Sequence, residues 1–260
     1  MPEPGMFVEE RKIKILERIE TQRKATVAEL CDLFNVSSAT IRNDLRDLET
    51  AGLLIRTHGG AMVKSKTGME QDMTQRGVQH LPEKRRIAEA ALRLVEDGDT
   101  LILDSGTTTL ELARLLERKQ DITVVTNDLT IALALEDSLS ARVLFMGGIV
   151  RRKYHCTVLY GSAGRDILAG LSVDKAFMAL NSFSLDKGAS TPDINHAETK
   201  KLMMSIAAKV ILLFDSSKMG RNSFALFAPL ESIDTIVTDS LSALERTRLE
   251  EIGIDAVIAD

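Results

Sequence analysis

The amino-acid sequence predicts an α/β protein with two domains, an N-terminal winged helix-turn-helix domain and a C-terminal, mostly parallel α/β domain. Residues 1–62 show helical periodicity interrupted by tight turns. Residues 63–81 are polar and lack clear periodicity, which is typical of a linker. In residues 82–260, apolar runs of strand length alternate with helical patterns. This alternation indicates βαβ units around a parallel sheet.

The composition is that of an ordinary globular protein, with 44% hydrophobic and 27% charged residues. No stretch approaches the run of about 20 apolar residues that a membrane helix needs, and the first residues lack the apolar core of a signal peptide. We therefore expect a cytoplasmic protein with no membrane partner. The net charge of −5 argues only weakly against nucleic acid, because DNA responds to local patches.

The cysteine content indicates a reducing compartment. The chain has two cysteines, Cys31 and Cys156, and they form no metal-ligand spacing. We therefore expect neither a metal nor a cofactor.

The first two elements are predicted to be helices. Ile13, Leu16 and Ile19 fall on one face of the first helix. Thr26 is placed to cap the second helix, and Glu29, three residues later, completes a capping box.

The third helix has one apolar and one polar face. Ile41, Leu45 and Leu48 form a buried stripe, and Asn43 and Arg46 fall on the opposite side. Ser37 or Ser38 caps this helix, and Thr40 and Arg42 flank its polar face. Asparagine can bond adenine and arginine can bond guanine in a bidentate way, whereas hydroxyls suit phosphates. The pattern is that of a helix-turn-helix with a DNA-reading second helix.

A hairpin is predicted after the third helix. Gly52 ends the helix and the pair Gly59–Gly60 turns the hairpin, which places Arg56 and His58 near the DNA backbone or minor groove. An alternative is a winged-helix module that binds only protein, although the polar face disfavours it.

The stretch FNVSSATIRNDLRDLETAGLLIRTHGGA, residues 34–61, resembles the DNA-binding signature of the DeoR family of bacterial transcription regulators. The resemblance implies binding of double-stranded operator DNA. The sequence departs from the family pattern at Asn43, where arginine is usual, so operator preference is not carried over. The expected DNA-binding residues are Ser37, Ser38, Thr40, Arg42, Asn43, Arg46, Arg56 and His58.

Seven strands and four intervening helices are predicted in the second domain. The strands are expected at residues 100–104, 122–126, 142–148, 174–180, 209–215, 234–239 and 255–260. The helices are expected at residues 108–117, 129–137, 196–208 and 242–253.

The stretch DSGTTT, Asp104–Thr109, joins a predicted strand to a predicted helix. After a parallel strand, such a turn lies at the carboxyl edge of the sheet, where ligands of α/β proteins bind. The amides of residues 106–109 would open the helix and suit a phosphate. Asp104 would repel a phosphate, so a sugar hydroxyl is its expected partner. The alternative is that Ser105 or Thr107 only caps the helix. The stretch lacks the lysine of a nucleotide-binding P-loop.

Further polar residues follow other strands. Residues 82–260 resemble the sensor domain of the same family in the stretches EKRRIA, DSGTTT, VTND, STPD, AETKK and DSSKMGR. The resemblance implies a fold like ribose-5-phosphate isomerase and a phosphorylated sugar or related metabolite as effector. The family's glycine soon after Lys175-Ala176-Phe177 is absent, which leaves the identity of the effector open. The expected effector-binding residues are Asp104, Gly106, Thr107, Thr108, Thr109, Asn127, Arg151, Glu198 and Lys218.

An active sugar-phosphate isomerase is the main alternative to a regulator. Such enzymes carry an acid-rich loop that moves a proton, whereas residues 179–183 contain no carboxylate. We therefore expect a non-enzymatic regulator, in particular a repressor of a sugar-metabolism operon. Reading two half-sites implies a homo-oligomer, a dimer or a tetramer.

Overall fold

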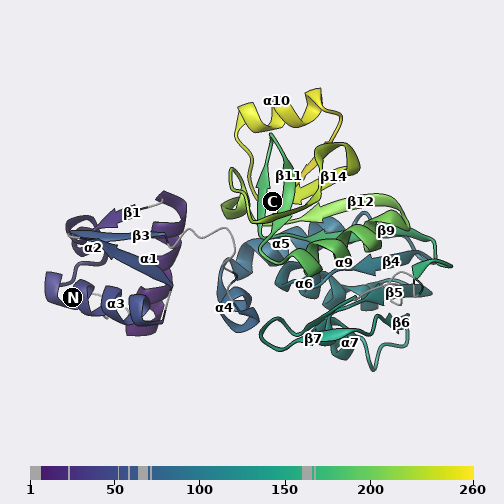
Figure 1. The fold of residues 1–260 in the computed structure, drawn as a ribbon, viewed down its shortest axis with the longest axis horizontal. Coiled ribbons are helices and arrows are strands. Elements are labelled where there is room, and N and C mark those ends of the chain that lie inside the picture. Colours follow the sequence, from purple (N-terminus) through teal and green to yellow (C-terminus); the bar gives the residue numbers. More distant parts are fainter. Residues whose placement is uncertain are drawn as a thin grey trace. The chain divides into compact units, whose positions relative to one another are not determined.

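The computed structural model describes residues 7–22, 24–51, 53–57, 59–63, 70, 72–159, 166 and 168–260. The chain divides into two compact units, Met1–Lys66 and Thr67–Asp260. Figure 1 shows the elements of each unit.

The N-terminal unit contains three helices and a three-stranded antiparallel sheet of order β1-β3-β2. Its elements are α1 (Val8–Gln22), β1 (Lys24–Thr26), α2 (Val27–Phe34), α3 (Ser38–Thr50), β2 (Leu54–Thr57) and β3 (Gly60–Val63). The stripe Ile41, Leu45 and Leu48 is buried as predicted, whereas in α1 Ile15 is fully buried and Ile13 only half-buried.

The caps of the N-terminal unit follow the predicted pattern. Thr26 and Glu29 form a capping box at α2, and the Ser37 hydroxyl accepts the amide of Thr40 at the start of α3. Asn35 takes the left-handed conformation (φ 51°) that ends α2. The predicted hairpin is present, because β2 pairs with β3 through Thr57 and Gly60. A side chain at Gly60 would place its Cβ 2.1 Å from the Ala25 carbonyl oxygen, so β1 requires glycine there.

The C-terminal unit is built on a seven-stranded sheet of order β15-β14-β12-β9-β4-β5-β6, in which every pairing is parallel. All seven predicted strands are present. They are β4 (Thr100–Leu103), β5 (Ile122–Thr126), β6 (Ala141–Phe145), β9 (Val173–Ala179), β12 (Ala207–Leu213), β14 (Thr235–Thr238) and β15 (Asp255–Ile258).

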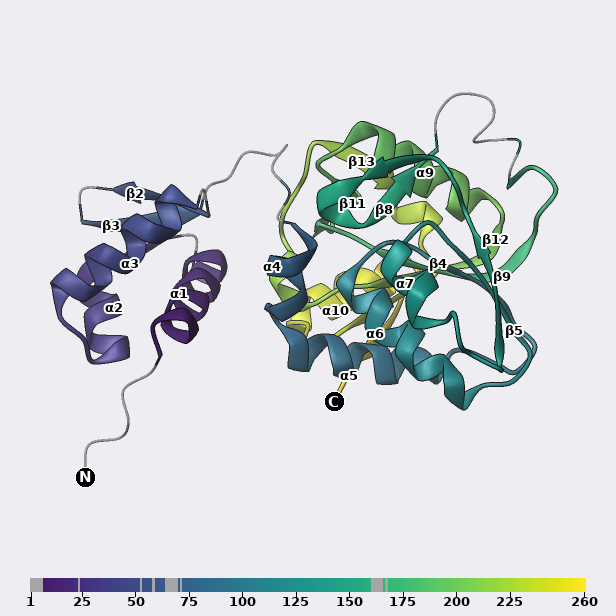
Figure 2. The same cartoon turned by 90° about the horizontal axis from the view of Figure 1, so that it is seen from below.

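Helices cover both faces of this sheet. They are α4 (Met73–Val78), α5 (Leu81–Leu92), α6 (Thr107–Leu115), α7 (Leu129–Ala134), α9 (Ile194–Ser205) and α10 (Ala243–Glu251). Side chains alternate along the strands, so Leu101 and Leu103 pack with α5 and α6 while Ile102 packs on the α9 side. Figure 2 shows α5 and α6 on one side of the sheet and α9 on the other.

Short strands form two further sheets that the sequence did not predict. Strands β7 (Ile149–Arg151) and β8 (Cys156–Val158) make a hairpin around the turn Arg152–Tyr154. A second small sheet has the order β10-β11-β13. Its strands are β10 (Ser182–Ser184), β11 (Gly188–Thr191) and β13 (Ala225–Ala228).

The predicted linker, residues 63–81, differs in part from the structure. It contains α4, whose start is capped by the Asp72 carboxylate accepting the amide of Gln75, and Met73 anchors the helix in the core. Six residues are too few to show helical periodicity, which is why the sequence pattern missed this helix. Among the described residues, no helix has the length and apolar character needed to cross a membrane.

Candidate functional site

The turn Asp104–Thr109 lies where the strand order of the sheet reverses. The chain proceeds from β4 to β5 and β6 on one side, and β9, β12, β14 and β15 lie on the other. The turn begins at the carboxyl end of β4, and the amide of Ala179, at the end of β9, donates to Asp104 Oδ2 over 2.9 Å. Open α/β sheets bind ligands in the crevice at such a switch point.

Gly106 brings the turn close to β9. A Cβ at this position would lie 2.5 Å from the Cβ of Ala179, so the packing excludes a side chain. Gly106 is also the N-cap of α6, and no side chain caps this helix. The hydroxyl of Thr109 instead donates to the carbonyls of Asp104 (2.6 Å) and Gly106 (2.9 Å). The cap alternative for Ser105 or Thr107 is therefore not realised, and the first-turn amides of α6 have no side-chain acceptor.

A small pocket opens at this helix start. Thr107 and Thr108 line it, together with Ala179 and Leu180 from the end of β9. The cationic side chains in its wall are those of Arg76, Lys84 and Lys218. They outnumber the carboxylate that shares the wall, that of Asp215. Main-chain amides at a helix start and several cations suit a dianion such as a phosphate.

Lys84 is the most deeply buried of these cations. It is 4% exposed, and its ammonium donates to the carbonyl oxygens of Gln79 (2.5 Å) and Arg76 at the end of α4. Burial lowers the pKa of Lys84 to about 8. Lys84 is not among the residues expected from the sequence, although it stands in the stretch EKRRIA. His80 also lines the pocket, and its Nε2 has no hydrogen-bond partner among the described residues.

Asp104 lies beneath the pocket rather than in its wall. It is 0% exposed, and the Lys200 ammonium donates to its Oδ2 and to the Ala179 carbonyl oxygen, the latter over 3.0 Å. Burial raises the pKa of Asp104 against the opposing influence of Lys200. Its Oδ1 lies 3.9 Å from His196 Nε2. In this structure Asp104 thus ties α9 to the ends of β4 and β9.

Two residues of α9 that the sequence analysis did not select, His196 and Lys200, join this centre. A signal for them exists, because they share the buried stripe of α9 with Ala197, Met203 and Met204. Lysine is rarely buried unless it is paired, so its place in an apolar stripe indicates a buried partner.

Arg151 takes part in a neighbouring ion-pair network. Its guanidinium lies 2.7 Å from Glu70 Oε2, 3.6 Å from Asp193 Oδ2 and 3.3 Å from His196 Nδ1. Glu70 also pairs with Arg76, over 3.4 Å. Arg76 therefore links this network to the pocket.

The other predicted effector-binding residues are scattered. Asn127 is fully buried and donates to the Thr157 carbonyl over 2.8 Å. Glu198 lies on the exposed side of α9 and pairs with Lys201 over 2.8 Å. Of the predicted set, Thr107, Thr108 and Lys218 share the pocket, whereas Glu198 lies apart from it. The described residues contain no group of three or more side chains suited to a metal ion.

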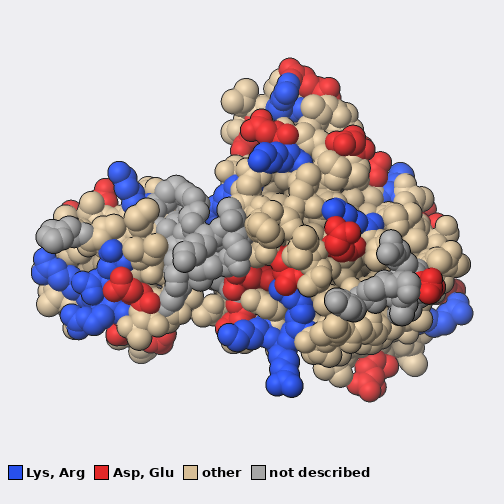
Figure 3. Space-filling model, in the orientation of Figure 1, with Lys and Arg blue, Asp and Glu red and all other residues tan. Residues whose placement is uncertain are grey.

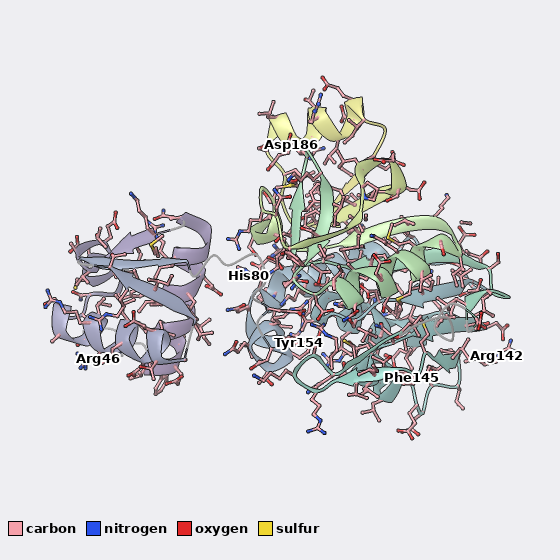
Figure 4. All side chains as sticks on the ribbon, viewed as in Figure 1. Arg46, His80, Arg142, Phe145, Tyr154 and Asp186 are labelled. Atoms are coloured by element: carbon pink, nitrogen blue, oxygen red, sulfur yellow. The ribbon has the colours of Figure 1, made fainter. Side chains whose placement is uncertain are left out.

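The polar side of α3 is exposed as predicted. Arg42, Asn43 and Arg46 are exposed, and Arg46 donates to Asn43 Oδ1 over 3.2 Å. Ser37 and Ser38 are exposed at the helix start and Thr40 is half-buried. Figure 3 shows Lys and Arg side chains gathered over this part of the N-terminal unit, and Figure 4 labels Arg46 there.

The remaining DNA-facing predictions concern the hairpin. Arg56 is exposed on β2 and lies 3.6 Å from Glu49. His58 lies outside the described residues. Asp44 is not part of the polar face, because it is buried and accepts two bonds from Arg11 of α1 (2.7 and 3.2 Å).

The chain matches two family models. Residues 11–67 match the DeoR-like helix-turn-helix domain, and residues 79–240 match the DeoR C terminal sensor domain. It is 38% identical to the HTH-type transcriptional regulator GlpR of Haloferax volcanii, over 97% of this chain and 98% of that protein. It is 34% identical to the HTH-type transcriptional repressor GlcR of Bacillus subtilis, over 91% and 90%.

Two further similarities complete the comparison. The putative aga operon transcriptional repressor of Escherichia coli O157:H7 is 32% identical over 96% of this chain and 93% of its own. The structure of ribose 5-phosphate isomerase A from Methanocaldococcus jannaschii is 15% identical with a TM-score of 0.39, over 54% of this chain and 55% of that one. A structural likeness this weak carries no argument about function.

Proposed function

Because the chain belongs to the DeoR family of helix-turn-helix transcriptional regulators and is not an enzyme, we propose that it represses a sugar-metabolism operon under the control of a phosphorylated sugar. The alternative of an active isomerase is set aside, since the relatives that match almost the whole chain are regulators. In this proposal α3 reads double-stranded operator DNA and the C-terminal unit binds the effector.

The proposed DNA contacts use the exposed side of α3. Asn43 and Arg46 lie one turn apart and face away from the buried stripe of Ile41, Leu45 and Leu48, so both can reach base edges in a major groove. Ser37 and Ser38, at the start of the helix, suit backbone phosphates. Arg56 of the hairpin is exposed and supplies a further backbone contact.

The proposed effector site is the pocket at the start of α6, and one observation carries it: the uncapped helix start and three cations line the same small pocket. The amides of residues 106–108 and Lys218 would hold the phosphate, with Arg76 and Lys84 adding positive charge. Asp104 and Thr109 would shape the turn from beneath, and Asn127 would hold β8 beside the end of β5 through the Thr157 carbonyl. A neutral, apolar ligand would leave these charges unpaired, which favours a phosphorylated one.

The proposed assembly is a homo-oligomer, a dimer or a tetramer. Helix-turn-helix proteins read two half-sites about one turn of DNA apart, which requires paired reading helices. The proposal also requires the protein to act in the cytoplasm, where operator DNA lies.

Effector titration separates the two halves of this proposal. We expect one member of a panel of pentose and hexose phosphates to change operator protection in footprinting. Lys218→Ala should weaken binding of that compound roughly ten- to a hundred-fold, the contribution of one charge-assisted contact. Thr108→Asp should weaken it further by repelling the dianion. Both variants should still protect the operator, and unchanged effector affinity in both would place the effector elsewhere.

A further inference from the structure

Glu70 is a buried carboxylate held between two arginines. It follows Lys66, the last residue of the N-terminal unit, by four positions. Its side chain is 3% exposed and pairs with Arg151 (2.7 Å) and Arg76 (3.4 Å). The Tyr154 hydroxyl, labelled in Figure 4, donates to the Glu70 carbonyl over 3.4 Å. Glu70 is thus held within the C-terminal unit by both arginines and by Tyr154.

A first connection runs from Glu70 to the pocket through Arg76. The same guanidinium that pairs with Glu70 belongs to a residue that lines the pocket beside Thr107, Thr108 and Lys218. Arg76 can pair fully with Glu70 or turn its charge towards a dianion in the pocket. The Glu70 carboxylate and a phosphate in the pocket therefore compete for the Arg76 guanidinium.

A second connection runs through Arg151 and His196 to the turn itself. Burial and nearby cations hold the pKa of His196 well below its ordinary value, so the ring is neutral. Arginine can only donate, so His196 Nδ1 accepts from Arg151 and Nε2 carries the proton. That proton is donated to the hydroxyl of Ser105, 3.0 Å away. A shift of the turn is thereby transmitted to the arginine that holds Glu70.

We propose that Glu70 is a resident carboxylate that competes with the bound phosphate for Arg76, so that filling the pocket weakens the ion pair that holds Glu70 within the C-terminal unit. This inference rests on the proposed function for the identity of the pocket. It adds how occupancy of the pocket reaches Glu70, four positions after the end of the N-terminal unit. Removing the competing charge should strengthen anion binding. It should also uncouple phosphate binding from the ion pair between Arg76 and Glu70.

The test uses the full chain, with inorganic phosphate as the probe and Glu70→Gln as the variant. Glutamine keeps the shape and the acceptor oxygen but removes the charge. In calorimetry we expect phosphate to bind Glu70→Gln about three- to ten-fold more tightly than it binds the wild type. This is at the low end of the coupling found between sites, which is usually about five- to 150-fold. Glu89→Gln is the matched control, because Glu89 also pairs with an arginine, Arg118, but on the exposed side of α5. It should bind phosphate as the wild type does.

Hydrogen exchange gives a second readout that does not depend on a measured affinity. Saturating phosphate should speed amide exchange in α4 and at Glu70 in the wild type, and should add no further increase in Glu70→Gln. Equal phosphate affinity in Glu70→Gln and wild type, or unchanged exchange in the wild type, would overturn the proposal.

Lys218→Ala distinguishes this failure from failure of the proposed pocket. If Lys218→Ala weakens phosphate binding while Glu70→Gln leaves it unchanged, the pocket stands and the competition is refuted. If Lys218→Ala also leaves binding unchanged, the pocket itself is misplaced, and the competition at Arg76 is refuted with it.

Discussion

Lys200 donates to Asp104 beneath the turn that opens α6, although 96 residues separate the two in the sequence. Both side chains are almost completely buried, at 1% and 0% exposure. We expect Lys200→Met to destabilise the C-terminal unit by about 3–5 kcal/mol, because it leaves a buried carboxylate unpaired. Urea denaturation followed by circular dichroism measures this.

Controls for Lys200 come from its neighbour and its partner. Lys201→Met, on the exposed side of the same helix, should change the free energy of unfolding by less than about 0.5 kcal/mol. The double variant Asp104→Asn with Lys200→Met should recover much of the loss, since no buried charge then remains. A loss below about 1 kcal/mol in Lys200→Met would mean that Asp104 is neutral in the folded protein.

Gly106 should tolerate no side chain while Ala179 faces it. The Cβ of Gly106→Ala would lie 2.5 Å from that of Ala179, so we expect a loss of about 1–3 kcal/mol from overpacking. Ala179→Gly should rescue it in part, because it removes the colliding methyl group. Thermal unfolding of the two single variants and the double variant tests this, and additive effects would contradict a direct clash.

Binding of a sugar phosphate should weaken above pH 8. The pKa of Lys84 is lowered to about 8 by burial, so its ammonium is charged at pH 7 and mostly neutral at pH 9. A phosphate monoester, with a second pKa of about 6, stays dianionic over this range. We expect roughly ten-fold weaker binding at pH 9 than at pH 7, and a smaller loss in Lys84→Arg, whose charge persists. Calorimetry with the compound selected from the panel measures both, and a pH-independent wild-type affinity would exclude Lys84 as a contributor.

The polar face of α3 should carry operator specificity. Asn43→Ala and Arg46→Ala should each weaken specific binding by about 1–3 kcal/mol if they make bidentate base contacts. Lys14→Ala, a change on the exposed part of α1, is the control for a general loss of positive charge. Footprinting on the native operator is the measurement. Full protection by both α3 variants would assign DNA reading to another element.

Much of the fold follows from local patterns in the sequence. The five inner strands of the parallel sheet, β14, β12, β9, β4 and β5, are buried over most of their length, so each appears as a short apolar run. The caps at Thr26 and Ser37 depend on neighbours within three residues, so they can be predicted from the sequence. The short strands β7, β8, β10, β11 and β13 were missed because three or four residues carry too little periodicity.

The missed parts of the site depend on contacts that are distant in the sequence. Lys200 stands in the apolar stripe of α9, which indicates a buried partner, but its partner Asp104 lies 96 residues away in the sequence. Glu70 stands in a polar stretch that resembles a linker, and its burial comes from Arg151, 81 residues further on. Glu198 belongs to the motif AETKK, as Lys200 does, yet helical geometry turns it to the exposed side of α9.

The reversal of strand order at β4 also determines when the C-terminal unit can close during synthesis. β4, β5 and β6 emerge from the ribosome together, but β4 lacks its other partner until β9 follows, and 75 residues separate Asp104 from Ala179. Until then one edge of β4 remains unpaired, and unpaired strand edges in incompletely folded chains are prone to aggregate. The N-terminal unit, complete by Lys66, can fold during this interval. The helix-turn-helix can therefore be in place before the strand ends that line the pocket have met.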